Sequence, residues 1–125
     1  MSLTGIDHFV IVAGDIEKTI RFYTEVLGMA HTVKDGHHGL SFPGGRISLH
    51  AKKGEFLPCA ARPEIGSCDF CLRSDRPIAE VKAELEKRGA KIELGPAART
   101  GALGAMKSVY LRDPDGNLVE ICSYA

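Results

Sequence analysis

The chain has 125 residues, of which 44% are apolar and 26% charged, and its sixteen basic residues balance sixteen acidic ones. This length suffices for one compact domain with its own core, and the composition excludes a disordered chain. The zero net charge gives no indication of nucleic acid or a membrane surface as a partner.

The first residues contain neither a basic segment nor the apolar run of a secretory signal, and no apolar run reaches the roughly 18 residues of a membrane helix. We therefore expect a cytoplasmic protein. Its four cysteines are expected to be reduced and buried, because free cysteine behaves as a small hydrophobe. Cys68 and Cys71 belong to one expected strand at an odd offset, which sends their side chains to opposite faces and argues against a shared zinc or redox site.

The first half of the chain predicts one helix among four strands. Ile6–Val12 is β-branched and apolar, which indicates a strand. A helix is expected over Ile16–Leu27, with Asp15 as its N-cap and Gly28 at its end. Three short strands are expected after it, near Ala30–Lys34, Gly39–Phe42 and Arg46–Ala51.

The second half repeats this order after a loop rich in glycine, proline and alanine. Ser67–Arg73 predicts a strand, and Asp75 and Pro77 open a helix that ends at Gly89. Three strands are then expected near Lys91–Leu94, Ser108–Arg112 and Leu118–Ser123. The turn Asp113–Asn117 joins the last two, because its Asp, Pro, Gly and Asn residues favour a hairpin.

Two βαβββ modules follow from this repeat, so the expected fold class is α+β, in one domain over 1–125. Module one covers 1–51, a linker covers 52–66 and module two covers 67–125. A module with a single helix cannot cover both faces of its sheet. We therefore expect the two modules to pair and their helix-free faces to line a shared metal-binding cleft.

Strand alternation selects four side chains for this cleft. If Ile11 faces the helix, His8 points to the opposite face, and the same argument applies to His50, Asp69 and Glu120. A single strand histidine is more often a satisfied polar residue than a ligand. A carboxylate within the apolar strand around Glu120, however, needs a cation or hydrogen bonds to offset its burial. Two imidazoles and two carboxylates suit one divalent ion, which is Fe, Mn, Ni, Co or Zn.

The repeat relates these residues to one another. His8 and Asp69 lie 61 positions apart, and His50 is matched with Glu120, 70 positions further on. The second half therefore holds nine extra residues, most of them in the expected loop Gly95–Lys107.

Three segments resemble recurring motifs of the vicinal oxygen chelate superfamily, namely Asp7–Val10, Arg21–Gly28 and Asp113–Glu120. This superfamily includes glyoxalase I, bleomycin-resistance proteins, extradiol dioxygenases, fosfomycin-resistance transferases and methylmalonyl-CoA epimerase. The resemblance covers nearly the whole chain and implies a glyoxalase-like fold. Arg46–His50 and Gly95–Ala102 resemble a narrower group of small glyoxalase-domain proteins, similar to glyoxalase-domain-containing protein five and to virulence-associated members.

The resemblance implies a metal-dependent enzyme with lyase or isomerase chemistry, comparable to lactoylglutathione lyase, on a small oxygenated substrate chelated to the metal. His8, His50 and Glu120 match ligand positions of the family, whereas most metal-dependent members have His, Gln or Glu where this chain has Asp69. Glu120 or Asp69 would act as the general base. Two alternatives are an extradiol-type dioxygenase, with His8, His50 and Glu120 as its ligand triad, and a metal-free drug-binding protein.

The expected loop Gly95–Lys107 carries two cations, Arg99 and Lys107. They are candidates for binding a carboxylate or phosphate of the substrate, and the alternative is a solvated surface loop. Three further histidines (His31, His37 and His38) are expected to be exposed in or near a loop. The expected partners are a small-molecule substrate and, by the resemblance, a second copy in a homodimer, with modules either retained or exchanged.

Overall fold

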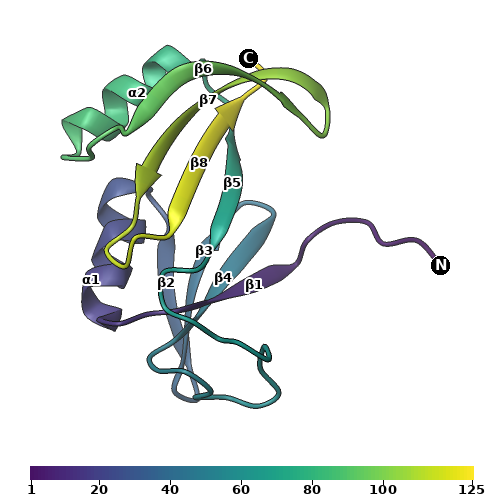
Figure 1. Ribbon diagram of the computed structural model, residues 1–125, viewed down its shortest axis with the longest axis vertical. Coiled ribbons are helices and arrows are strands. Elements are labelled where there is room, and N and C mark those ends of the chain that lie inside the picture. Colours follow the sequence, from purple (N-terminus) through teal and green to yellow (C-terminus); the bar gives the residue numbers. More distant parts are fainter. The chain divides into compact units, whose positions relative to one another are not determined.

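The computed structural model describes residues 1–125, and the chain divides between Gly66 and Ser67 into two compact units. Each unit contains one four-stranded sheet with one helical segment, in the order β-α-β-β-β (Figure 1). The α+β fold of two βαβββ modules is therefore confirmed. The segment 52–66, expected as a linker, belongs to the first unit, so we call 1–66 the first module and 67–125 the second module.

The first module contains β1 (His8–Val12), α1 (Ile16–Arg21), the π-helical turn η1 (Phe22–Val26), β2 (Ala30–Lys34), β3 (His37–Phe42) and β4 (Gly45–His50). Its strand order is β1-β4-β3-β2, with β1 parallel to β4 and the other neighbours antiparallel. The Asp15 carboxylate caps α1 by accepting a hydrogen bond from the Lys18 amide at 3.1 Å, as expected. The expected helix is regular only as far as Arg21, then widens into η1, and ends at Gly28 with φ of 74°.

The core of the first module lies on one face of its sheet. The side chains of Ile11, Leu40, Ile47 and Leu49 alternate onto this face and are at most 1% exposed. Tyr23 of the helical segment is buried as well. The opposite face of β1 and β4 therefore carries the remaining residues of these strands.

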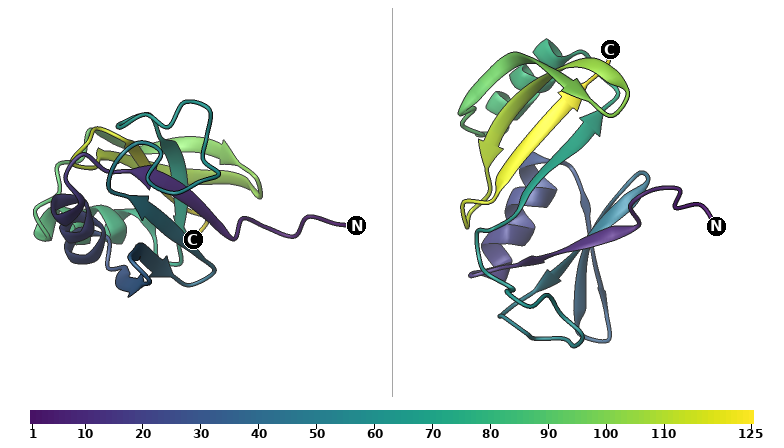
Figure 2. Two further views of the ribbon diagram at one scale, coloured as in Figure 1. Left: turned by 90° about the horizontal axis from the view of Figure 1, so that it is seen from below. Right: turned by 45° about the vertical axis from the view of Figure 1, so that its right-hand side comes forward.

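The second module contains β5 (Asp69–Ser74), α2 (Ile78–Lys87), β6 (Leu94–Gly101), β7 (Gly104–Arg112) and β8 (Leu118–Ser123). Its strand order is β5-β8-β7-β6, and β8, yellow in Figure 2, lies between β5 and β7. Helix α2 contacts β6 and β7 and buries Ile78, Val81 and Leu85, at the helical spacing that the sequence predicts. None of the helices in the chain has the length and apolarity to cross a membrane.

The prediction of a loop over Gly95–Lys107 is wrong, because this segment forms most of the β6–β7 hairpin. Tyr124, near the end of the chain, explains the difference: its hydroxyl accepts a hydrogen bond from the Leu103 amide at 3.1 Å. A side chain at Gly101 would collide with that hydroxyl and with the Met106 sulfur. The hairpin is thus held by a residue that is distant in the sequence, which local composition does not reveal.

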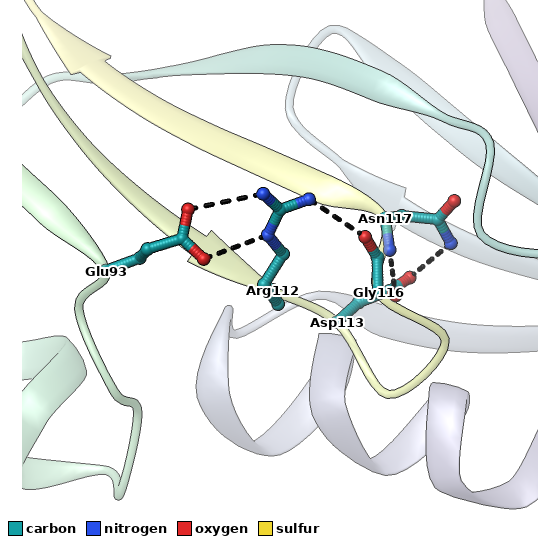
Figure 3. Close-up of polar contacts among 5 residues, drawn as sticks. All are labelled: Glu93, Arg112, Asp113, Gly116 and Asn117. Atoms are coloured by element: carbon teal, nitrogen blue, oxygen red, sulfur yellow. Dashed lines mark hydrogen bonds and ion pairs between the residues drawn. The ribbon is translucent and has the colours of Figure 1, made fainter.

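The predicted turn between β7 and β8 is confirmed and has a buried polar centre (Figure 3). The Asp113 carboxylate accepts hydrogen bonds from the Asp115 amide at 3.0 Å, the Asn117 amide at 2.9 Å and the Asn117 side chain at 2.8 Å. Asn117 in turn accepts a hydrogen bond from the Cys68 amide at 2.8 Å, which ties the turn to the start of β5. Next to the turn, Arg112 forms a bidentate ion pair with Glu93.

Candidate functional site

Each module has a site face, which we define as the sheet face opposite its buried apolar residues. In the first module, this face carries His8 and Val10 of β1 and Ser48 and His50 of β4. In the second module, it carries Asp69, Cys71, Ser108, Tyr110 and Glu120. Strand alternation predicted that these faces carry His8, His50, Asp69 and Glu120, and the register within each module agrees with that prediction.

His8 is half exposed and hydrogen-bonded on one side only. Its Nδ1 lies 2.8 Å from the Asp7 carboxylate, and this hydrogen bond with His8 lowers the pKa of Asp7. A carboxylate on Nδ1 fixes the orientation and tautomer of an imidazole and leaves Nε2 available to a ligand. Asp7 was not among the residues selected from the sequence.

His50 is buried beneath an aromatic ring from the segment 52–66. The Phe56 ring contacts His50 edge-on at 5.2 Å between centroids and stacks on His37 at 3.8 Å. The Nδ1 atom of His50 is buried and has no hydrogen-bond partner. Buried polar atoms are rarely left in this state, so His50 needs a partner that the chain by itself does not supply.

The two histidines of the first module lie at different positions along the strands of their sheet. His8 is paired with Arg46, whereas His50 is paired with Val12, which is four residues further along. At roughly 3.3 Å per residue, this offset is about 13 Å along the strands. Within the first module, the two imidazoles therefore do not lie at one point.

The same register corrects the predicted equivalence of His50 and Glu120. The pair Phe9 and Ile47 corresponds to the pair Phe70 and Val119, because each joins the first and last strands of its module. The counterpart of Glu120 is thus Ser48, and the counterpart of His50 is Cys122. The match was wrong by two residues, because alternation specifies the face of a strand and not the position along it.

Glu120 is held by a hydrogen bond that the sequence analysis missed. The Ser108 hydroxyl donates to its Oε2 atom at 2.6 Å, and Ser108 is fully buried. On the neighbouring strands, Tyr110 and Cys71 are paired directly with Glu120. Asp69 lies on the same face, two positions before Cys71, which is about 7 Å along the strand. Alternation along β7 would have selected Ser108 and Tyr110 from the sequence.

The cysteines are free, but only Cys122 is buried as expected, since Cys68 is half-buried and Cys59 and Cys71 are exposed. Cys71 is directed toward Cys122 and Glu120 and not toward Cys68. Partial burial raises the pKa of the Cys71 thiol far above its ordinary value, and the neighbouring Cys122 and Glu120 raise it further. The thiol is therefore neutral at physiological pH.

The two expected substrate-binding cations lie on opposite faces of the second sheet. The Arg99 Nε donates to the Tyr110 hydroxyl at 2.9 Å, and its guanidinium carbon lies 5.5 Å from the centre of that ring. Arg99 therefore shares the face of Glu120. Lys107 is paired with Ser123 and lies on the other face.

The remaining histidines lie in strands, His37 and His38 next to the turn between β2 and β3, and His31 and His37 are exposed as expected. His31 of β2 and His38 of β3 form a cross-strand pair, with Nε2 of the first 2.9 Å from Nδ1 of the second. No group of three or more His, Cys, Asp or Glu side chains that could hold a metal ion occurs among residues 1–125. The ligand candidates are thus divided between the modules, with His8 and His50 in the first and Asp69 and Glu120 in the second.

The family model of the Glyoxalase/Bleomycin resistance protein/Dioxygenase superfamily matches residues 5–121 of this chain. The chain belongs to this superfamily. Lactoylglutathione lyase from Agrobacterium tumefaciens shares the glyoxalase fold, with a TM-score of 0.74 and 22% identity over 98% of this chain and 96% of that one.

Two relatives are more similar in sequence. Virulence protein STM3117 of Salmonella typhimurium is 47% identical over 125 residues, which cover 99% of this chain and 87% of the relative. Its crystal structure has a TM-score of 0.95, with 44% identity and full coverage of both chains. Glyoxalase domain-containing protein RDO1 of Mycosarcoma maydis is 42% identical over 99% of this chain and 70% of its own length.

Proposed function

We propose that the protein is a divalent-metal-dependent enzyme of the glyoxalase superfamily that performs lyase or isomerase chemistry on a small oxygenated substrate. One observation carries this proposal. The site face of each module presents a ligand-type side chain at equivalent strand positions, His8 in β1 and Asp69 in β5, and the second module adds Glu120, already oriented by Ser108.

The surroundings of these residues fit a metal ion. Ligand histidines usually donate their second ring nitrogen to a carboxylate, as His8 does with Asp7, and ligand carboxylates are usually hydrogen-bonded, as Glu120 is by Ser108. We propose that His8, Asp69 and Glu120 hold the ion. One imidazole and two carboxylates suit Fe, Mn, Co, Ni or Zn and leave positions open for substrate oxygens.

We assign His50 to the substrate and not to the ion. It is displaced by four residues from the strand position paired with His8, and its buried Nδ1 lacks a partner. A polar group of the substrate would provide that partner. Phe56, which contacts the His50 ring, would exclude water from the same region.

The chemistry of the site divides between the ion and the chain. When bound, a dication supplies Lewis acidity, which polarises a substrate carbonyl. The chain supplies a carboxylate that accepts a proton from the carbon next to that carbonyl. Arg99, with its guanidinium beside Tyr110 on the Glu120 face, supplies a donor for an anionic group of the substrate. Lys107 is left out of this role, because it lies on the opposite face.

Elemental analysis of the purified protein tests this function. We expect near-stoichiometric divalent metal in the wild type, its loss in His8→Ala, and its retention in the control variant His31→Ala. Metal-free wild-type protein that is fully folded and cannot be loaded would contradict the proposal and favour a small-molecule-binding protein. For loaded protein, isomerisation of hemithioacetals supports the lyase function, whereas oxygen uptake with catechols would replace it by ring cleavage.

We also propose a homodimer, and mixing two variants tests whether its modules are retained or exchanged. A His8→Ala subunit combined with a Glu120→Gln subunit restores one intact site per dimer only if each site takes residues from both chains. If the modules are exchanged, the isolated mixed dimer should carry half of the wild-type metal content. No recovery in a confirmed mixed dimer would place each site within one chain.

A further inference from the structure

Ser108 is a buried polar residue that makes one directed contact. It is fully buried in β7, and its hydroxyl donates to the Glu120 Oε2 at 2.6 Å. This is the length of a charge-assisted hydrogen bond between a hydroxyl and a carboxylate, which is about twice as strong as a neutral one. The contact engages one carboxylate oxygen and selects one orientation of the carboxylate.

Asp69 lacks a directed contact of the kind that Ser108 makes with Glu120. It is exposed at the start of β5, and its carboxylate accepts no hydrogen bond from another side chain. The neighbouring cation Arg112 is itself engaged by Glu93 and by the Gly116 carbonyl. The two carboxylates of the second module thus differ in freedom, since one is anchored and the other can rotate.

We propose that Ser108 is a positioning residue that fixes Glu120 as the permanent carboxylate ligand and leaves Asp69 as the carboxylate that acts on the substrate. This inference rests on the proposed function. In the step it assigns, an Asp69 oxygen takes the proton from the carbon next to a substrate carbonyl, and the electron pair of that C–H bond moves onto the carbonyl oxygen. In a substrate with a hydroxyl on that first carbon, such as a hemithioacetal, Asp69 then returns the proton to the former carbonyl carbon. The hydroxyl proton passes to the former carbonyl oxygen and the hydroxyl oxygen becomes the new carbonyl, which completes an isomerisation.

The test is the dissociation constant of Mn²⁺, measured by calorimetry on protein freed of metal. Loss of an outer hydrogen bond to a metal ligand weakens metal binding by about 10- to 100-fold. We expect a weakening of this size in Ser108→Ala. The matched control is Ser123→Ala, a buried serine in β8 whose hydroxyl oxygen accepts only a backbone amide, and it should bind Mn²⁺ like the wild type.

A double-variant cycle separates positioning from a general loss of structure. In a Glu120→Gln background, Ser108→Ala should cause no further weakening of Mn²⁺ binding, whereas an unspecific structural effect would add to the first change. Additive effects, or a Ser108→Ala protein that binds as tightly as Ser123→Ala, would overturn the inference. If Glu120→Gln itself leaves Mn²⁺ binding unchanged, the proposed function fails and not merely the role of Ser108.

Asp69→Asn tests the second half of the inference. Asparagine keeps the size and an oxygen ligand but cannot accept the proton. We expect Mn²⁺ binding to weaken less than in Glu120→Gln, while exchange of the substrate C–H with deuterated water, followed by NMR on a hemithioacetal, falls at least about 100-fold. Wild-type exchange in Asp69→Asn would show that another group is the base.

Discussion

The two modules share one topology but carry different chemistry on their site faces. In the first module, His8 and His50 lie four residues apart along the sheet, and Ser48 occupies the position that corresponds to Glu120. In the second module, Glu120 is anchored by Ser108, and Asp69 lies two positions before Cys71, the residue that is paired with Glu120. A repeated scaffold therefore does not imply a repeated ligand set. Under the proposed function, the first module supplies an imidazole and a substrate contact, and the second supplies the carboxylates.

The largest expected effect concerns the two counterparts Glu120 and Ser48. Glu120→Gln removes a charged ligand, so we expect divalent-metal affinity to fall at least about 100-fold. Ser48→Ala removes a hydroxyl from the corresponding position and should leave the affinity unchanged. Calorimetric titration of both proteins decides the matter, and equal effects of the two substitutions would mean that the modules contribute symmetrically.

The turn centred on Asp113 should matter more for folding than its counterpart in the first module. Asp113→Ala leaves the Asn117 amide and side chain without their acceptor, so we expect the free energy of unfolding to fall by about 2–4 kcal/mol. Pro43→Ala, in the turn between β3 and β4, is the control and should cost below about 1 kcal/mol. Urea denaturation followed by circular dichroism measures both, and a smaller loss for Asp113→Ala would contradict the structural role assigned to the turn.

The thiols of the two modules should differ in reactivity. Cys59 of the first module is exposed, whereas burial raises the pKa of Cys71 and Cys68 in the second and Cys122 is buried. Since the thiolate is the reactive form, we expect one thiol to react with iodoacetamide at pH 8 at least about 10-fold faster than the other three. Mass spectrometry should place it at Cys59, and Cys59→Ser should abolish it. Fast labelling of Cys71 would contradict its environment in the structure.

The smallest effect concerns the ion pair beside the β7–β8 turn. Arg112 lowers the pKa of Glu93 below its ordinary value of 4.5, so the pair stabilises the folded state above that pH. The contribution is lost as the pH falls through the lowered pKa, because the protonated carboxyl no longer attracts Arg112. Glu93→Gln should therefore be slightly less stable than the wild type at pH 7, with the difference vanishing as the pH falls below the lowered pKa of Glu93. A difference that grows on acidification would contradict the ion pair.

Local patterns in the sequence were sufficient for much of the fold. The Asp15 cap, the apolar spacing of α2 and the turn at Asp113–Asn117 depend on neighbours in the chain, and the structure has each of them. The β6–β7 hairpin was not predictable in this way, because Tyr124 holds its tip from the end of the chain.

The sequence predicts which face of its sheet each site residue occupies, but not its position along the strand relative to the neighbouring strands. Alternation placed Glu120 on the correct face, yet the pairing of His50 with Val12 depends on the register between β1 and β4, which no local pattern encodes. Phe56 was missed for a related reason. It belongs to a segment without regular structure, and its contact with His50 arises only from the path of that segment.

We propose that one ion is held by His8 of the first module together with carboxylates of the second. Pulsed electron paramagnetic resonance of the Mn²⁺-loaded protein detects imidazole nitrogen bound to the metal. We expect a signal from one imidazole in the wild type and in His50→Ala, and no such signal in His8→Ala. A signal that survives in His8→Ala and disappears in His50→Ala, or no imidazole signal in loaded wild-type protein, would contradict it.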